Sequence, residues 1–326
     1  MGLSIAALIT TTEKNKKHLE QLMSSICSQS IKIEKVIIVY DGIVRPLKQT
    51  FEECPLPISW IDNRKAHFLT LLQNKAIESS SEDLILLLND DVILEANFIE
   101  ELLKAMSKDA LIGMVCGKLL RMDKTTIDTA GQLLGNKRTP VERGYGAIDT
   151  GEFDAECYVF GSCGAAVLLR KSMLENCMIL EHEYFDSDYN MFYEDLDLSW
   201  RAANFGWKAF YTPHAVGFHA RGATAKEKKP IFEFLRPYNF AWLKSSLKSD
   251  VIKNRCMTII KNDSPYDFLC NLHHIFVYEA KVFLYCLIFD PGVILKTIKN
   301  LPVILKAFKK RKILKGKIKK RKKCTT

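Results

Sequence analysis

The chain has 326 residues, of which 48% are hydrophobic and 26% are charged, a size that suits one large α/β domain with an appendage or two smaller domains. This composition excludes a disordered chain, a collagen and a small disulfide scaffold. The ten cysteines are scattered and no two stand as Cys-x-x-Cys, so we expect no zinc ribbon and free thiols in a reducing cytosol.

The net charge of +9 is concentrated at one end of the chain. Residues 291–326 hold 14 of the 47 Lys and Arg residues and no acidic residue, which leaves 33 basic against 38 acidic residues elsewhere. A slightly acidic globular part is therefore followed by a strongly basic tail.

Neither a secretory signal nor a membrane span is predicted. Residues 1–12 are apolar, but a polar stretch follows without a cleavage pattern. The most apolar stretch, residues 268–289, is interrupted by polar and charged side chains, whereas a span needs roughly 20 mostly apolar residues. We expect a cytoplasmic protein, peripheral at the inner face of the cell membrane.

In chain order, the first part alternates short apolar runs with segments of helical spacing. The runs predict strands at residues 4–10, 35–40, 83–88 and 113–119, and the helical spacing falls at residues 18–27, 68–77 and 97–106. Nearly continuous apolar strands that alternate with helices indicate a mostly parallel sheet covered on both faces. Ligands of such sheets bind beyond the carboxyl ends of the strands, where Asp41 and the triplet Asn89-Asp90-Asp91 fall.

The second part is less regular. Residues 121–155 read as a long polar excursion, and β character returns at residues 157–170. A helix is predicted from the acidic cluster at Glu194, and two short strands are predicted at residues 208–211 and 215–219. From about residue 230 the pattern is helical and increasingly basic.

The triplet Asn89-Asp90-Asp91 comes directly after a predicted strand. Adjacent carboxylates repel unless a cation or hydrogen-bond donors offset their charge, and Mg²⁺ or Mn²⁺ bound through one or two carboxylates and substrate phosphates fits this motif. A turn that caps the following helix explains it equally well.

A second acidic cluster, Glu194-Asp195-Leu196-Asp197, begins the later helix. A carboxylate there can act as a general base, although acidic residues also favour a helix N-terminus through the dipole. His219 ends an apolar run and can ligate a metal, although a single histidine is more often structural. The sequence has no dinucleotide fingerprint, P-loop or nucleophile elbow.

Taken in order, the motifs resemble inverting family 2 glycosyltransferases of the GT-A fold, in the rhamnosyltransferase-like branch that builds bacterial surface polysaccharides. The resemblance covers residues 3–225. It implies a GT-A domain at residues 1–228 and a helical, basic region at residues 229–326. It is carried by Thr10-Thr11, Tyr40-Asp41-Gly42, Asn74-Lys75-Ala76, Leu88 to Asp91, Gly161 to Gly164, Phe192 to Arg201, Gly206-Trp207-Lys208 and His219.

The resemblance also implies roles for individual residues. Asp195 would be the catalytic base, with Glu194 orienting it, and Asp91 and His219 would hold a divalent metal, Mg²⁺ or Mn²⁺. The residues that would contact the nucleotide sugar are Thr10, Thr11, Asp41, Asn74, Lys75, Asn89, Asp90 and Arg201.

The implied function is transfer, with inversion, of a sugar from a nucleotide-diphosphate sugar to a hydroxyl of a glycan or lipid-linked acceptor. By resemblance the donor would be dTDP-rhamnose, with a UDP-hexose next. Two alternatives remain from the residues themselves: a nucleotidyltransferase, and a non-catalytic carbohydrate- or lipid-binding module with a decayed site.

The basic tail has an interpretation of its own. Residues 292–308 have apolar residues at helical spacing and residues 309–323 are nearly all basic, a combination that can dock on anionic lipid. A solvated tail is the alternative. No recognition pattern for nucleic acid accompanies it, so we expect no nucleic-acid partner.

Overall fold

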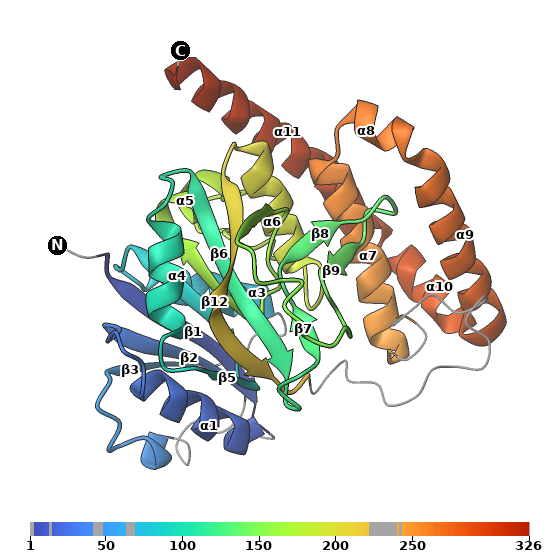
Figure 1. Cartoon of the computed structure of the whole chain (residues 1–326). Helices are drawn as coiled ribbons and strands as arrows, with labels where there is room; N and C mark the ends of the chain where they lie inside the picture. Colours follow the sequence, from blue (N-terminus) through green and yellow to red (C-terminus); the bar gives the residue numbers. More distant parts are fainter. Residues whose placement is uncertain are drawn as a thin grey trace.

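The structure of the chain is a computed structural model that describes residues 3–12, 15–41, 48–62, 69–221, 240 and 243–325. A sheet lies at the centre, and the C-terminal helices form a group beside it (Figure 1). The strands are β1 (Ile5–Thr12), β2 (Lys35–Asp41), β3 (Ile58–Asp62), β4 (Leu84–Asn89), β5 (Val92–Leu94), β6 (Ile112–Arg121), β7 (Ile127–Thr129), β8 (Gln132–Leu134), β9 (Pro140–Glu142), β10 (Cys157–Val159), β11 (Ala166–Arg170) and β12 (Lys208–His219).

The helices fall into two groups along the chain. Those that accompany the sheet are α1 (Lys16–Cys27), α3 (Leu69–Glu78), α4 (Phe98–Met106), α5 (Lys171–Cys177) and α6 (Glu194–Asn204). Those that follow it are α7 (Ser245–Asn262), α8 (Pro265–Cys270), α9 (Leu272–Phe289), α10 (Pro291–Lys299) and α11 (Leu301–Thr325).

The central sheet is mixed and mostly parallel, with the strand order β10-β12-β6-β11-β4-β1-β2-β3. Strand β1 pairs in parallel with β2 and β4, and β12 pairs in parallel with β6. Because β11 is antiparallel to both β4 and β6, these parallel strands all run the same way. Their carboxyl ends therefore meet at one edge, which brings Thr12, Asp41, Asn89 and His219 to the same side of the molecule.

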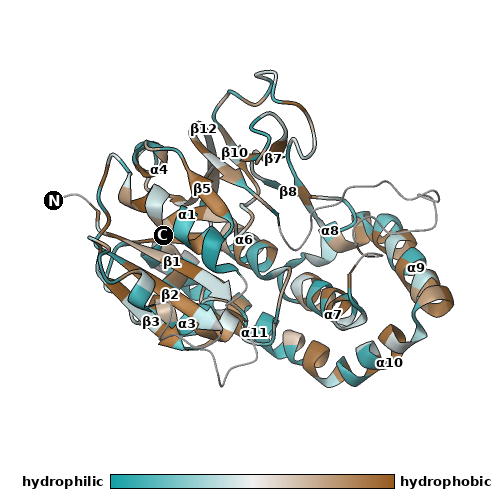
Figure 2. Ribbon diagram, turned by 90° about the horizontal axis from the view of Figure 1, so that it is seen from below, coloured by the Kyte–Doolittle hydropathy of each residue, from teal (hydrophilic) through white to brown (hydrophobic). Residues whose placement is uncertain are grey.

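The alternation of side chains divides the core between the two faces of the sheet. Ile5, Ala7 and Ile9 of β1 pack with α1 and α4, whereas Ala6 and Leu8 pack with α3, α5 and α6. The buried stretches of the central strands are mostly apolar, as burial on both faces requires, and Figure 2 shows hydrophobic segments along β1 and β2. The predicted α/β GT-A architecture with helices on both faces and a helical C-terminal region is thus confirmed.

Most predicted elements are present, and the structure adds β3, β5 and α5, which the sequence analysis does not predict. Two further regions differ from the prediction. The two short strands around Pro213 are one strand, β12, whose register with β6 shifts between Tyr211 and Val216. The polar excursion contains β7 and a small two-stranded sheet of β8 and β9, which the sequence pattern does not reveal.

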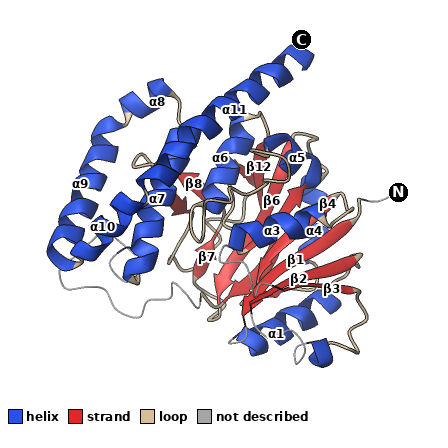
Figure 3. Cartoon of the chain, turned by 180° about the vertical axis from the view of Figure 1, so that it is seen from behind, coloured by secondary structure: helices blue, strands red, loops and turns tan. Residues whose placement is uncertain are grey.

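The C-terminal helices share a core with the start of α6. Tyr193 and Leu196 pack with Met257 of α7 and with Ile304 and Ala307 of α11. Helix α7 lies between the sheet and α9, and α9 lies at the outer edge of the molecule (Figure 3). The division at residue 228 remains a prediction.

A buried network of ion pairs also joins α6, α7 and α11. Lys261 of α7 lies 2.9 Å from Asp197 of α6 and also pairs with Asp186, and all three side chains are fully buried. Lys310 of α11 pairs with Asp186 as well, and it lies 2.9 Å from Glu183. Part of the basic tail therefore neutralises buried carboxylates in the part of the protein that contains the sheet.

Candidate active site

The first acidic cluster lies where β4 ends and β5 begins. Asn89 is exposed, whereas Asp90 is buried and accepts hydrogen bonds from Thr11 Oγ1 at 2.6 Å and from Asn15 Nδ2 at 3.2 Å. Burial raises the pKa of Asp90, and these hydrogen bonds only partly oppose the effect. Asp90 is thus held by hydrogen bonds within the protein, whereas Asn89 is exposed at the end of β4.

Asp91 and His219 meet at this edge from different strands. Nε2 of His219 lies 3.2 Å from Oδ1 of Asp91, and Nδ1 lies 2.8 Å from Oδ2 of Asp128 in β7. Burial alone would lower the pKa of His219, but the hydrogen bonds with Asp128 and Asp91 outweigh it and raise the pKa to about 9. Asp128 is fully buried and also pairs with Arg221.

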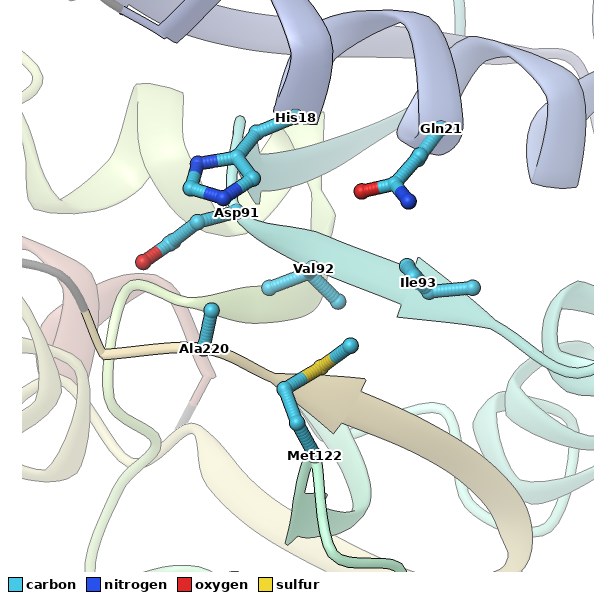
Figure 4. A pocket seen from close by; sticks show the side chains of 7 residues that line it. All are labelled: His18, Gln21, Asp91, Val92, Ile93, Met122 and Ala220. Carbon is cyan, nitrogen blue, oxygen red and sulfur yellow. The ribbon is translucent and has the colours of Figure 1, made fainter.

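A small cavity of about 130 Å³ borders Asp91. Figure 4 shows His18 and Gln21 of α1 on one side of it, with Met122 and Ala220 on the other. Its volume is below the roughly 300 Å³ of small ligand pockets, so it can accommodate only part of a nucleotide sugar.

The second acidic cluster is presented by an unusual backbone. Phe192 and Tyr193, immediately before α6, have φ values of 71° and 70°, a left-handed conformation that non-glycine residues rarely adopt. Asn254 of α7 holds this turn, because its side-chain amide donates hydrogen bonds of 2.9 Å to the carbonyl groups of Met191 and Phe192. Helix α7 therefore positions the start of α6.

Asp195, in the first turn of α6, is held at both carboxylate oxygens. Oδ1 accepts a hydrogen bond of 2.7 Å from the backbone N–H of Leu196, and Oδ2 accepts one of 3.2 Å from Nε2 of Gln132. The same Gln132 amide nitrogen lies 3.1 Å from Oε1 of Glu142, whose other oxygen accepts from Thr129. The hairpin of β8 and β9 thus supplies a bridge between two carboxyl groups.

Burial dominates the acid–base properties of this cluster. It raises the pKa of Asp195 and, together with the negative charge of Asp195, raises the pKa of Glu194 to about 8. Burial also raises the pKa of Glu142 to about 7. One oxygen of Glu194 is buried and makes no hydrogen bond within the described chain. Such raised carboxyl values are typical of functional sites.

The two clusters are linked by contacts through the polar segment between them. Asp128, which holds His219, is followed directly by Thr129, which donates to Glu142. Cys163 lies within electrostatic range of Asp128, Glu142 and Asp195, whose charges add to burial in raising its pKa. A continuous series of contacts therefore leads from Asp91 to Asp195.

Two residues predicted to contact the nucleotide sugar have other roles. The Asn74 side chain is buried and makes two 2.8 Å hydrogen bonds with the backbone N–H and carbonyl of Phe185. Arg201 is 1% exposed; it pairs with Asp197 at 2.9 Å and donates to two backbone carbonyls. Both prediction errors have one cause, which is that their polar groups are satisfied inside the core.

The other predicted contacts stay predictions. Thr10 of β1 lies opposite Asn89 of β4, and its hydroxyl is buried without a hydrogen-bond partner in the part of the chain that the structure describes. Lys75 is exposed on α3. Asp41 ends β2 opposite Thr12, and its side chain lies outside the described residues.

The structure adds four residues that the sequence analysis does not identify. Asp128 orients His219, Gln132 donates to Asp195, Glu142 accepts from Gln132, and Asn254 fixes the turn before α6. None of these residues belongs to a recognisable sequence motif, so the sequence pattern does not indicate a functional role for any of them.

A mostly parallel sheet with the Asn89-Asp90-Asp91 triplet after β4 and a carboxylate pair at the start of α6 is typical of the GT-A fold of nucleotide-sugar transferases. The model of the family described as "Glycosyltransferase like family 2" matches residues 3–245. The chain therefore belongs to glycosyltransferase family 2, whose members invert the anomeric centre.

One curated relative is an N-acetylglucosaminyltransferase from Bradyrhizobium diazoefficiens, 25% identical over 277 residues. The match covers 78% of this chain, and the chain spans about half (51%) of the relative.

Three solved structures share the fold. GalNAc-T7 with UDP, GalNAc and Mn²⁺ has a TM-score of 0.60 at 10% identity, over 79% of this chain and 48% of that one. TarS residues 1–349 from S. aureus with UDP-GlcNAc has a TM-score of 0.55 at 11% identity, with coverages of 94% and 82%. The mannosyltransferase PcManGT from Pyrobaculum calidifontis with GDP-Man and Mn²⁺ has a TM-score of 0.53 at 13% identity, with coverages of 98% and 87%.

Proposed function

We propose that this protein transfers a sugar by single displacement, with Asp195 as the general base. Asp195 would take the proton from an acceptor hydroxyl as that oxygen attacks the anomeric carbon and the bond to the nucleoside diphosphate breaks. The observation that carries this proposal is the placement of Asp195, held at both oxygens, in the same site as the Asp91–His219 pair. Glu194, with its unpartnered oxygen, would contact the acceptor or orient the base.

The Asp91–His219 pair fits a divalent metal, Mg²⁺ or Mn²⁺. A carboxylate and an imidazole nitrogen face each other at 3.2 Å, and Asp128 engages the other ring nitrogen in the manner of residues that orient metal-bound histidines. The described residues contain no group of three or more His, Cys, Asp or Glu arranged to hold a metal, as expected where a donor diphosphate supplies further oxygens. When bound, such a metal would act as a Lewis acid toward the departing diphosphate.

The donor we propose is a nucleoside diphosphate sugar bound at the carboxyl ends of β1, β2 and β4. The exposed amide of Asn89 supports this location, because it is accessible to a ligand, and the buried hydroxyl of Thr10 beside it makes no hydrogen bond within the described residues. dTDP-rhamnose is the first candidate from the motif resemblance. UDP-N-acetylglucosamine is the second, because the curated relative is an N-acetylglucosaminyltransferase.

The acceptor we propose is a hydroxyl of a glycan or lipid-linked glycan in surface polysaccharide synthesis at the inner face of the cell membrane. The basic C-terminal helices support this location, and they pack directly on the start of α6. The acceptor would thus be brought to the same side of the protein as the base.

The decisive experiment is a thermal-shift panel of nucleotide sugars, each with and without Mn²⁺. A ligand that binds only the folded protein raises its stability by RT ln(1 + [L]/Kd). We expect one dTDP- or UDP-sugar to produce the largest shift, and only with metal. No shift with any sugar in a folded sample would contradict the proposal.

A further inference from the structure

Exposed apolar side chains gather on the C-terminal helices. Of the 24 large hydrophobic side chains that are exposed in the described part of the chain, 15 lie between Tyr266 and Phe308. Monomeric soluble proteins rarely expose contiguous apolar surface on this scale unless it binds something. In Figure 2 the brown of α9 and α10 lies at the outer edge of the molecule, away from the sheet.

Helix α9 is apolar on its exposed face as well as on its buried one. At 3.6 residues per turn, one half of its circumference carries Leu272, Phe276, Phe283, Leu284, Leu287 and Ile288, each exposed, and Phe276 is 69% exposed. The opposite half packs inward through Val282, Tyr285 and Cys286. The exposed half therefore has no partner within the described protein.

A second apolar stripe runs from α10 into α11. Leu295, Ile298, Leu301, Leu305 and Phe308 follow one another at helical spacing, and all are exposed. The same face of α11 then becomes basic, with exposed Lys312, Lys315 and Lys319. This order of apolar and then cationic side chains is typical of helices that lie in a membrane interface.

The acidic residues beside this surface are paired with basic residues of α7. Glu279 of α9 pairs with Arg255 of α7, and Asp290 pairs with Lys248 at 3.1 Å. The chain contains no acidic residue after Asp290. An anionic surface would therefore meet lysines without opposing carboxylates, each contributing favourably to binding.

The arrangement favours a helix that lies on a bilayer rather than one that crosses it. Helix α9 is long and apolar enough to span by length and composition. Its inner half, however, is packed in a core with Phe240 and Val293, so the helix cannot be surrounded by lipid without breaking this core. Helix α10 starts two residues after α9 ends and packs back against the same core.

We propose that the outer half of α9 and the stripe from Leu295 to Phe308 insert shallowly into an anionic lipid bilayer, while Lys312, Lys315 and Lys319 contact its headgroups. A second consequence rests on the proposed function. The same docking would bring a lipid-linked acceptor near the site, because Ile304 and Ala307 of α11 pack with Tyr193 and Leu196 at the start of α6. The docking surface itself does not depend on the identity of the donor.

Vesicle flotation of the full-length protein tests this proposal. We expect flotation with phosphatidylcholine vesicles that contain phosphatidylglycerol, and much weaker flotation with phosphatidylcholine alone. The triple variant Phe276→Ser, Phe283→Ser, Leu287→Ser should lose on the order of 100-fold in vesicle affinity, because the buried apolar groups carry interfacial binding. Its matched control, Ile148→Ser with Leu180→Ser, removes equally exposed side chains elsewhere and should bind as the unmodified protein does.

Two double lysine variants test the contribution of the positive charge. Lys312→Gln with Lys315→Gln should weaken binding to anionic vesicles on the order of tenfold, whereas Lys32→Gln with Lys48→Gln should leave it unchanged. Thermal shifts with the donor are measured on every variant without lipid, so that loss of docking is separated from loss of the donor site.

Three results would overturn the proposal. The unmodified protein could fail to float, or the triple serine variant could float as well as its control. Alternatively, the protein could be a dimer in solution that the serine substitutions dissociate without changing vesicle affinity, which would assign the apolar surface to a second copy of the chain.

Discussion

Gln132 donates a hydrogen bond of 3.2 Å to Asp195, a residue 63 positions further along the chain. The same amide nitrogen reaches Glu142 at 3.1 Å, so a neutral group stands between two carboxyl groups that would otherwise face each other. This geometry fixes the orientation of one oxygen of Asp195, a residue that is largely buried.

Replacing Gln132 by Leu should slow transfer without weakening donor binding. The base would lose one of its orienting donors, and misplacement of a catalytic group costs on the order of 100-fold in turnover. Steady-state kinetics would be compared with the donor-induced thermal shift, with Gln49→Leu as a surface control. An equal loss of donor affinity would show that Gln132 acts on the donor and not on the base.

Asp195→Asn tests the base itself. The amide keeps the size of the side chain but cannot accept a proton, so we expect turnover to fall by about 10³-fold while the donor thermal shift is retained. A product assay by mass spectrometry measures the residual rate. Near-normal turnover would remove Asp195 from the mechanism.

The metal proposal predicts graded effects along the Asp91–His219–Asp128 series. Asp91→Ala should abolish the Mn²⁺-dependent part of the donor thermal shift. Asp128→Asn should weaken metal affinity on the order of tenfold, because it acts only through the orientation of His219. Titration of donor binding against Mn²⁺ measures both, and Glu181→Gln, which removes an exposed carboxylate, serves as the control. If the donor shift of Asp91→Ala remained fully metal-dependent, the metal would lie elsewhere.

The pH dependence follows from the raised carboxyl pKa values. Burial raises the pKa of Asp195 above its ordinary value, and a base acts only when ionised. The pH profile of kcat/KM should therefore have an acid limb on which activity rises with pH, and the pKa of this limb should be higher than that of an ordinary aspartate. Glu142, with a pKa raised to about 7, interacts unfavourably with the charge of Asp195. Because Glu142 is still protonated at the pH where Asp195 ionises, Glu142→Gln should leave the acid limb of kcat/KM in place, and a limb that moves to lower pH would show that Glu142 already carries a charge there.

Lys310→Met should destabilise the fold, because it leaves Asp186 and Glu183 buried with less positive charge. Removing one partner of a buried ion pair costs about 3 kcal/mol. Lys309→Met, at the exposed neighbouring position, should change stability by less than about 0.5 kcal/mol. Urea unfolding followed by circular dichroism compares the two. Equal midpoints would show that the network contributes no stability.

The sequence predicts those elements of this structure whose conformation is determined by the residues of the segment itself. The run at residues 83–88 is apolar because β4 is buried on both faces, so its pattern is sufficient. Strands β7 to β9 have three residues each, and their pairing partners determine them.

The same limit applies within the site. Asp91 follows a strand and Asp195 begins a helix, each within an acidic cluster, so both can be recognised from the sequence alone. Gln132 and Asp128 acquire their roles only through partners brought together by folding. Arg201 shows the opposite error, because spacing along the helix does not reveal that its i,i+4 partner, Asp197, draws it into the core.

The buried network of Lys261, Lys310, Asp186 and Asp197 also limits how such an enzyme can be recombined. A chimaera that takes its last helices from another transferase would bring in new lysine positions but not the acids that face them. Exchange of the C-terminal helices would then leave uncompensated charge beneath the helix that carries Asp195. The C-terminal helices and the helix that carries Asp195 are therefore expected to evolve together as a single unit rather than as interchangeable modules.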